Sequence, residues 1–216
     1  MTKNKINCVS PFSVPLIQLT IEEDTDELQS CHEYMTSTYE SNKSKIDKNK
    51  NMGNMEALKK LRILEKFPKT KNILLKYVNK VLNEVMTYDA DFDITTSWLT
   101  ETKKGEQCQV HNHKNCFWSG VYYYDDTYDK ESGKLVFFNP LVRFSGYKIP
   151  ARENNPATSE EITSIPKPKS LILFPSFLDH MITTHNDENN RHSLAFNIVP
   201  LNLYGSGDST YDTEWF

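Results

Sequence analysis

The sequence lacks long apolar runs and any excess of positive charge. No stretch approaches the roughly 18 uninterrupted apolar residues that a membrane-spanning helix needs, so no membrane association is expected. The net charge of the 216 residues is −4, so no global positive field attracts nucleic acid, and a nucleic-acid partner is not expected. The N-terminal residues 1–12 contain lysines with no apolar run behind them, which predicts no secretory signal.

The cysteines form no Cys-x-x-Cys pair; they are Cys8, Cys31, Cys108 and Cys116. Because no export signal is expected, we predict reduced thiols in a cytoplasmic compartment. Cys108 and Cys116 flank a pair of histidines, so one of them could donate a thiolate ligand to a metal. Free thiols that are buried or half-buried are the commoner use of such residues.

No internal repeat is present, but the composition changes near residue 90. Helical spacing of apolar residues dominates before that point, with helices predicted over 22–39 and 70–86 and a short one within 55–67. We therefore predict one domain over residues 1–216. Its residues 1–90 form a mostly helical support region, and residues 91–204 form a β-rich core.

The second half is rich in aromatic and β-branched residues, with turn signals between short segments. Many short strands of this kind predict an antiparallel barrel or jelly roll, so the fold class is mainly β with a helical N-terminal half, α+β. A polar, proline-containing insert spans about residues 141–168. The predicted strands are 14–21, 92–101, 107–113, 117–125, 134–139, 170–176 and 191–201.

Two histidines in one predicted strand are the first sign of chemistry. His111 and His113 are two residues apart, so on a regular strand they share a face and could share a metal. Two ligands do not hold a catalytic metal, and an isolated His-x-His is more often a pair of hydrogen-bonded or exposed side chains. His180 follows an apolar strand far along the chain, which is where the third ligand of a barrel site is expected.

An arginine and a serine share one face of the last strong strand. Arg191 and Ser193 are followed by an apolar segment, so the strand is predicted to be buried, and a buried arginine needs an anion. An arginine fork beside a hydroxyl suits a carboxylate. His192 is predicted to face away from both, and His32 and His185 are predicted to lie on the surface.

The order of five segments resembles a known group of enzymes. His-x-His, SGVYYY, SGKLVFFNP, LFPSFLDH and RHSLAFN follow one another over roughly residues 92–200. This order is similar to that of the iron(II)- and 2-oxoglutarate-dependent oxygenase superfamily. The resemblance is in particular to a small family of oxygenases from phages and marine bacteria that is related to prolyl 4-hydroxylases.

The resemblance implies a double-stranded β-helix, a jelly-roll barrel buttressed by helices. It assigns His111, His113 and His180 as ligands of Fe(II). Most of the superfamily has a carboxylate where this chain has His113, so the role of His113 is open. Asp125, Asp126 or Asp179 could supply a carboxylate instead.

The resemblance also assigns the site of the cosubstrate, 2-oxoglutarate. Arg191 and Ser193 would grip its far carboxylate. A tyrosine of the prolyl hydroxylase branch reaches the same group, and the matching position is Tyr122. Tyr124 would share the face of Tyr122 and belong to the pocket, whereas Tyr123 would point into the core.

The implied activity uses O2 to decarboxylate 2-oxoglutarate to succinate while an unidentified substrate is hydroxylated, with a peptidyl side chain as the first guess. Asn197 and Trp98 are candidates for the pocket wall, although core packing is the preferred role for Trp98. The 141–168 insert could form a lid.

Further expectations follow from the resemblance. The chain is expected in the cytoplasm of a bacterium or of a phage-infected host, with oligomers allowed. A cupin-like three-histidine metalloenzyme that does not use 2-oxoglutarate is the first alternative. A non-catalytic jelly-roll protein that binds a ligand or serves as structure is the second.

Overall fold

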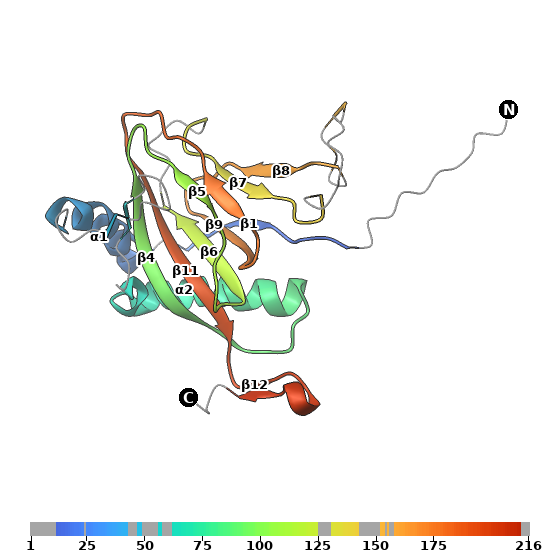
Figure 1. Cartoon of the computed structure of the whole chain (residues 1–216). Helices are drawn as coiled ribbons and strands as arrows, with labels where there is room; N and C mark the ends of the chain where they lie inside the picture. The colour runs from blue at the N-terminus through green and yellow to red at the C-terminus, as the bar shows by residue number, and fades with distance from the viewer. Residues whose placement is uncertain are drawn as a thin grey trace.

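Two antiparallel sheets face each other in the computed structural model, which describes residues 12–23, 25–42, 47–48, 56–57, 62–124, 131–142, 152–153, 155 and 158–212. The larger sheet has the strand order β1-β9-β6-β11-β4-β3-β2, and the smaller sheet has the order β5-β10-β7-β8. Together the two sheets form a jelly-roll barrel (Figure 1).

The strands have the following bounds. The larger sheet contains β1 (Ile17–Thr20), β2 (Asp47–Lys48), β3 (Glu56–Ala57), β4 (Phe92–Thr102), β6 (Trp118–Tyr123), β9 (Ser170–Pro175) and β11 (Arg191–Pro200). The smaller sheet contains β5 (Cys108–His111), β7 (Leu135–Phe138), β8 (Glu161–Ser164) and β10 (His180–Ile182). A separate hairpin contains β12 (Leu203–Tyr204) and β13 (Tyr211–Asp212).

The helices cover the outer face of the larger sheet, as Figure 1 shows. They are α1 (Asp26–Asn42) and α2 (Pro68–Asn79), and α2 continues as a π-helical segment over Lys80–Val85. Leu74 and Val78 of α2 share one buried cluster with Leu99, Leu194 and other residues of the sheet. This burial of an amphipathic face stabilises the helices on the sheet. No helix in the described part of the chain is long and apolar enough to cross a membrane.

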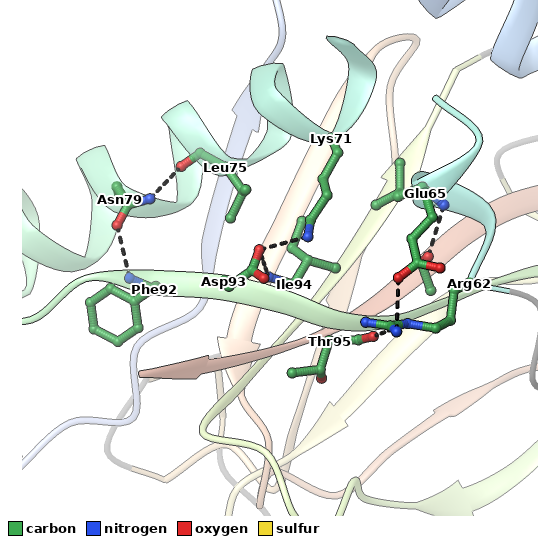
Figure 2. A network of polar contacts seen from close by, with 11 residues as sticks. Arg62, Glu65, Lys71, Leu75, Asn79, Phe92, Asp93, Ile94 and Thr95 are labelled. Carbon is green, nitrogen blue, oxygen red and sulfur yellow. Dashed lines mark hydrogen bonds and ion pairs between the residues drawn. The ribbon is translucent and has the colours of Figure 1, made fainter. Parts of the chain in front are cut away.

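Polar contacts fasten α2 to the adjacent strand β4, as Figure 2 shows. The Asn79 amide oxygen accepts a hydrogen bond from the Phe92 backbone N–H at 3.3 Å, and its nitrogen donates to the Leu75 carbonyl at 3.0 Å. Lys71 pairs with Asp93 at 2.8 Å. Because these contacts span the connection between the two elements, they fix where β4 begins.

The helical N-terminal half is found only in part. The helices predicted over 22–39 and 70–86 are present, but β1 joins one edge of the larger sheet, and β2 and β3 join the other. Helix α2 begins at Pro68, ahead of Thr70, because proline suits the first turn of a helix, where no backbone N–H is needed. The mainly antiparallel β architecture predicted for the second half is confirmed.

No strand was predicted in the polar insert, yet its described part contains β8, which forms the edge of the smaller sheet. The insert of about residues 141–168 was considered for a lid, and its residues 143–151, 154, 156 and 157 lie outside the described residues. A second cluster of buried residues fills the barrel interior between the two sheets. It includes Tyr123, Phe137, Ile172 and Phe174.

Candidate metal centre

Three histidines meet inside the barrel at one end of the smaller sheet. His111 ends β5 and lies directly across from His180, the first residue of β10. His113 follows β5, and its backbone N–H donates to the Ser176 carbonyl at 2.9 Å. One nitrogen from each of the three rings lies within 4.8 Å of the others. Such a spacing lets one metal ion bind all three.

A bulge in β5 aims His111 inward. His111 is paired with His180 and Cys108 with Ile182, so three steps along β5 match two steps along β10. The bulge brings Cys108 and His111 to the interior together. The prediction placed His111 and His113 on one regular strand, whereas β5 ends at His111 and the Ser176 contact holds His113.

Backbone carbonyls orient two of the rings. Nδ1 of His111 is 2.8 Å from the Gln109 carbonyl, and Nδ1 of His180 is 2.9 Å from the Leu178 carbonyl. Since a carbonyl only accepts, Nδ1 carries the proton in each ring and Nε2 keeps its lone pair. Hydrogen bonds of this kind fix the tautomer and orientation of metal-binding histidines.

The site favours neutral imidazoles. Burial lowers the pKa of His113 to about 4, with a smaller contribution from the charge of His111. Burial likewise lowers the pKa of His180 to about 3, again with His111 as the next cause. A ligand nitrogen must be deprotonated to bind a metal, so these environments keep the rings ready for one at neutral pH.

Trp98 and Asn197, both proposed for the pocket wall, lie beside His113. The ring of Trp98 stacks on that of His113, with centroids 5.5 Å apart and planes 23° from parallel. Asn197 hydrogen-bonds His113 with its side chain, and it also donates to the Thr96 hydroxyl at 3.0 Å. Asn197 therefore holds His113 from β11.

The alternative ligands do not reach the centre. Asp179 accepts a hydrogen bond from the Asn112 amide at 2.6 Å and is not part of the cluster, and Asp125 and Asp126 lie outside the described residues. Cys108 comes within 3.4 Å of Nδ1 of His111, but burial raises the pKa of its thiol to about 12. Cys108 is therefore a buried thiol, and it is not part of the three-histidine cluster.

Arg191 is a buried charge without an acidic partner among the described residues. It is 0% exposed. One terminal nitrogen, Nη2, donates to the Tyr123 hydroxyl, and the guanidinium lies 4.9 Å from the centre of that ring. The other two nitrogens, Nε and Nη1, have no hydrogen-bond partner in the described part of the chain. An uncompensated buried cation of this kind is built to meet an anion.

The tyrosine assignment is corrected by the structure. Tyr123, and not Tyr122, contacts Arg191 and belongs to the barrel interior, whereas Tyr122 belongs to the cluster under the helices. Tyr124 lies on the outer side too, where its ring stacks on His32 at 4.1 Å, so it does not line the pocket. The alternation along the strand was predicted correctly, but its inner and outer faces were exchanged, since a strand buried on both faces gives no polarity signal.

The structure also places three other polar residues for which the sequence gave a predicted position: His185, His192 and Ser193. His185 was predicted to be exposed but is fully buried, because Ser132 and the Asn189 carbonyl satisfy its two ring nitrogens at 3.1 and 2.7 Å. His192 faces outward, as predicted, and lies 3.0 Å from Glu101. The hydroxyl of Ser193 lies on the inner side, 2.5 Å from that of Thr100.

Comparisons with known proteins agree with this arrangement. Residues 96–197 match the family model described as "Putative 2OG-Fe(II) oxygenase". None of the curated proteins matches the chain. Among solved structures, a Pseudomonas putida prolyl-4-hydroxylase is similar, with a TM-score of 0.55 at 12% identity over 86% of this chain and 93% of that one.

Two further solved structures share the fold. A prolyl hydroxylase from Trichoplax adhaerens, in complex with a peptide fragment of hypoxia inducible factor, has a TM-score of 0.59 at 9% identity over 85% of this chain and 83% of that one. HygX from Streptomyces hygroscopicus, with nickel, 2-oxoglutarate and hygromycin B bound, has a TM-score of 0.56 at 13% identity over 87% and 83%.

The matched segment carries the three clustered histidines at 111, 113 and 180 and the buried Arg191, and it folds as the barrel of these solved structures. The resemblance found in the sequence is thereby confirmed. Residues 96–197 therefore match the iron(II)- and 2-oxoglutarate-dependent oxygenases, enzymes that use Fe(II), 2-oxoglutarate and O2, and the chain shares the fold of solved prolyl hydroxylases.

Proposed function

We propose that the protein is a dioxygenase that hydroxylates an organic substrate while 2-oxoglutarate is decarboxylated to succinate. One observation carries the proposal: a fully buried arginine with two unpartnered nitrogens shares the barrel interior with a three-histidine cluster. A metal-binding jelly roll that does not use a dicarboxylate has no need for Arg191, and leaving that charge uncompensated costs several kcal/mol.

The donor set fits Fe(II) and 2-oxoglutarate. His111, His113 and His180 would hold the metal through neutral nitrogens and leave coordination positions open. Cys108 is close both to the histidines and to Arg191: its sulfur contacts His111, and the charge of Arg191 acts on its thiol. When bound, Fe(II) and 2-oxoglutarate supply the oxidising chemistry with O2, and Arg191 would anchor the far carboxylate.

The residues of the chain position the reactants and shield them from water. Phe174 packs its ring at 4.8 Å from that of His180, and Trp98 covers His113. The apolar wall keeps water from the reacting centre. Three neutral ligands leave the full charge of the metal to be balanced by the cosubstrate, which favours a dianion such as 2-oxoglutarate.

The substrate is proposed to be a side chain of a peptide. Support comes from the shared fold with a prolyl hydroxylase whose solved complex contains a peptide. The half-exposed Trp98 beside His113 offers an aromatic surface at the mouth of the centre. Mass spectrometry of peptide libraries incubated with the loaded protein should reveal a gain of one oxygen; a small molecule that is oxidised while every peptide stays unchanged would contradict this assignment.

An anaerobic titration tests the proposed activity. Addition of Fe(II) and 2-oxoglutarate to the purified protein should produce a weak visible charge-transfer band, and Arg191→Met should abolish it at the same ligand concentration. Arg62→Met is the matched control, since that arginine lies on the outer face, in an ion pair with Glu65. If the iron-loaded wild-type protein forms no band and releases no succinate in air, the proposed function is wrong, and a three-histidine enzyme without 2-oxoglutarate becomes the better account.

A further inference from the structure

Three aromatic rings form a partly exposed surface at the end of the larger sheet where β4 and β6 begin and β11 ends, the lower end in Figure 1. The ring centroid of Tyr88 lies 5.2 Å from that of Phe117 and 6.4 Å from that of Phe92, and the rings of Phe92 and Phe117 are 6.1 Å apart. Phe92 is buried, but Tyr88 is 37% and Phe117 is 38% exposed. Val85, shortly before Tyr88 in the chain, is 62% exposed. Exposed apolar side chains that gather in this way are typical of an interaction site.

The turn that carries Tyr88 has an unusual backbone. Helix α2 continues as the π-helical segment Lys80–Val85, and the Tyr88 N–H donates to the Leu82 carbonyl at 2.9 Å. Thr87 has a φ of +58°, in the left-handed region, which a β-branched residue adopts only at a cost. Both π-helical turns and strained backbone positions are frequent at functional sites. The turn holds Tyr88 at the surface, beside Phe117.

The aromatic surface is connected to the metal centre through a short stretch of chain. Phe117 is four residues after His113. The Phe117 carbonyl accepts from the Ser176 N–H at 3.2 Å, and the Ser176 carbonyl accepts from the His113 N–H at 2.9 Å. Four residues of extended chain span at most about 14 Å. A peptide with one residue at the metal centre can therefore reach the surface with a residue about four positions away.

The chain around the rings carries net negative charge. Backbone hydrogen bonds join three segments here, residues 83–92, 115–118 and 198–202. Together these segments contain no lysine or arginine and three exposed acidic residues: Glu84, Asp89 and Asp91. Lys114 adjoins the second segment, so the acidic groups outnumber the basic ones. An apolar surface with this charge suits a partner that carries positive charge.

We propose that the surface formed by Val85, Tyr88 and Phe117 binds a basic peptide segment of the substrate and receives one of its aromatic or large aliphatic side chains. The bound side chain would lie within about four residues of the one that is hydroxylated. This assignment rests on the proposed function, because it takes a peptide as the substrate.

The negative charge disfavours the other occupants of such a surface. In a two-fold dimer formed through it, the acidic side chains of the two copies would face each other. Nucleic acid and anionic lipid are repelled for the same reason. A basic peptide has the opposite charge, and the attraction would speed its approach to the metal centre.

Selection of random peptides displayed on phage, followed by binding measurements, tests the assignment. Peptides retained by the whole chain should be enriched in lysine or arginine together with an aromatic or large aliphatic residue. Their synthetic copies should bind Tyr88→Ser with a Kd raised about tenfold or more, as expected for loss of a buried aromatic contact. Tyr88→Phe keeps the ring and should bind as the wild type does. Ile162→Ser is the matched control, since Ile162 is 58% exposed on β8 of the smaller sheet, and it should leave the Kd unchanged.

Removal of charge tests the second half of the assignment. Glu84→Gln/Asp89→Asn should raise the Kd, and added salt should weaken binding to the wild type more than to this double variant. Retained peptides that are acidic, or that lack aromatic and large aliphatic residues, would overturn the assignment, as would an unchanged Kd in Tyr88→Ser. A wild-type dimer in sedimentation equilibrium that dissociates in Tyr88→Ser would also overturn it and assign the surface to a second copy of the chain.

Failure of the proposed function is distinguishable, because peptide binding is measured without Fe(II) or 2-oxoglutarate. A protein that binds these peptides through Tyr88 but forms no charge-transfer band would lose the proposed function and keep the peptide-binding surface. A protein that forms the band, but whose peptide binding does not depend on Tyr88, would keep the proposed function and lose this assignment.

Discussion

Removing the buried charge of Arg191 should stabilise the protein while it destroys cosubstrate binding. In the absence of ligand the guanidinium is fully buried and has one hydrogen-bond partner, Tyr123, with no acidic partner among the described residues. Replacement of buried ionic groups by apolar ones of similar volume stabilises proteins by about 1–4 kcal/mol. Arg191→Met leaves the Tyr123 hydroxyl without its donor, which offsets about 1 kcal/mol of this gain.

The expected result is a ligand-free variant that unfolds at a higher temperature than the wild type. A net gain of up to about 3 kcal/mol corresponds to a Tm higher by up to about 12 °C for a chain of this length, at about 2–4 °C per kcal/mol. The double variant Arg191→Met/Tyr123→Phe should be more stable still, because the orphaned hydroxyl is gone. Thermal denaturation of the metal-free proteins, followed by circular dichroism, measures both.

Saturating 2-oxoglutarate provides the second half of the test. It should raise the Tm of the iron-loaded wild type by mass action and leave that of Arg191→Met unchanged. Arg62→Met is the surface control, since the Arg62 side chain is 56% exposed, and it should alter stability by less than about 0.5 kcal/mol. A ligand-free Arg191→Met that melts below the wild type would refute the reasoning, because Arg191 would then be compensated without a ligand.

Three further predictions concern the metal centre and the sheet. Asn197→Ala should weaken metal binding about 10–100-fold in a calorimetric titration, since Asn197 holds His113, and unchanged affinity would exclude that role. Burial acts to raise the pKa of Glu101, but the contacts of this carboxyl with His192 and Lys103 outweigh it, so the folded-state pKa lies below 4.5. The stabilisation that this lowered pKa provides is present above pH 4.5 and is lost as the pH falls through the folded-state pKa. Urea denaturation should therefore show that Glu101→Gln is less stable than the wild type at neutral pH and about equally stable in acid. A difference in stability that does not change with pH would contradict this prediction. Gly120→Ala should lower the free energy of unfolding by about 1–3 kcal/mol, seen as a lower urea midpoint, because the added Cβ would lie 2.3 Å from the Phe196 ring. Adding Phe196→Leu to this variant should recover part of the lost stability. A wild-type midpoint for Gly120→Ala alone would contradict the clash.

Local patterns reveal most of the barrel strands and the positions of the metal ligands. Apolar runs bounded by turn residues predict strands such as β4, β9 and β11 close to their observed bounds. The spacing of His111, His113 and His180 carries a family pattern that was recognisable before any geometry was known. The missed strands β8 and β10 are short, and β8 is exposed over most of its length, so neither contains an apolar run that a pattern could detect.

Tertiary contacts decided which polar residues face the site. Tyr122 and Tyr123 are neighbours of equal character, and only the packing of β6 between the helices and the barrel interior places Tyr123 against Arg191.

The antiparallel core, the three clustered histidines and the buried arginine could be predicted from the sequence alone, since each depends on residue type and short-range spacing. The tertiary structure decided the rest. The bulge in β5 turns His111 inward, the Ser176 carbonyl holds His113 beyond the strand end, and His185 is buried by a partner 53 residues away. These outcomes depend on register and on contacts between distant segments, which no local pattern encodes.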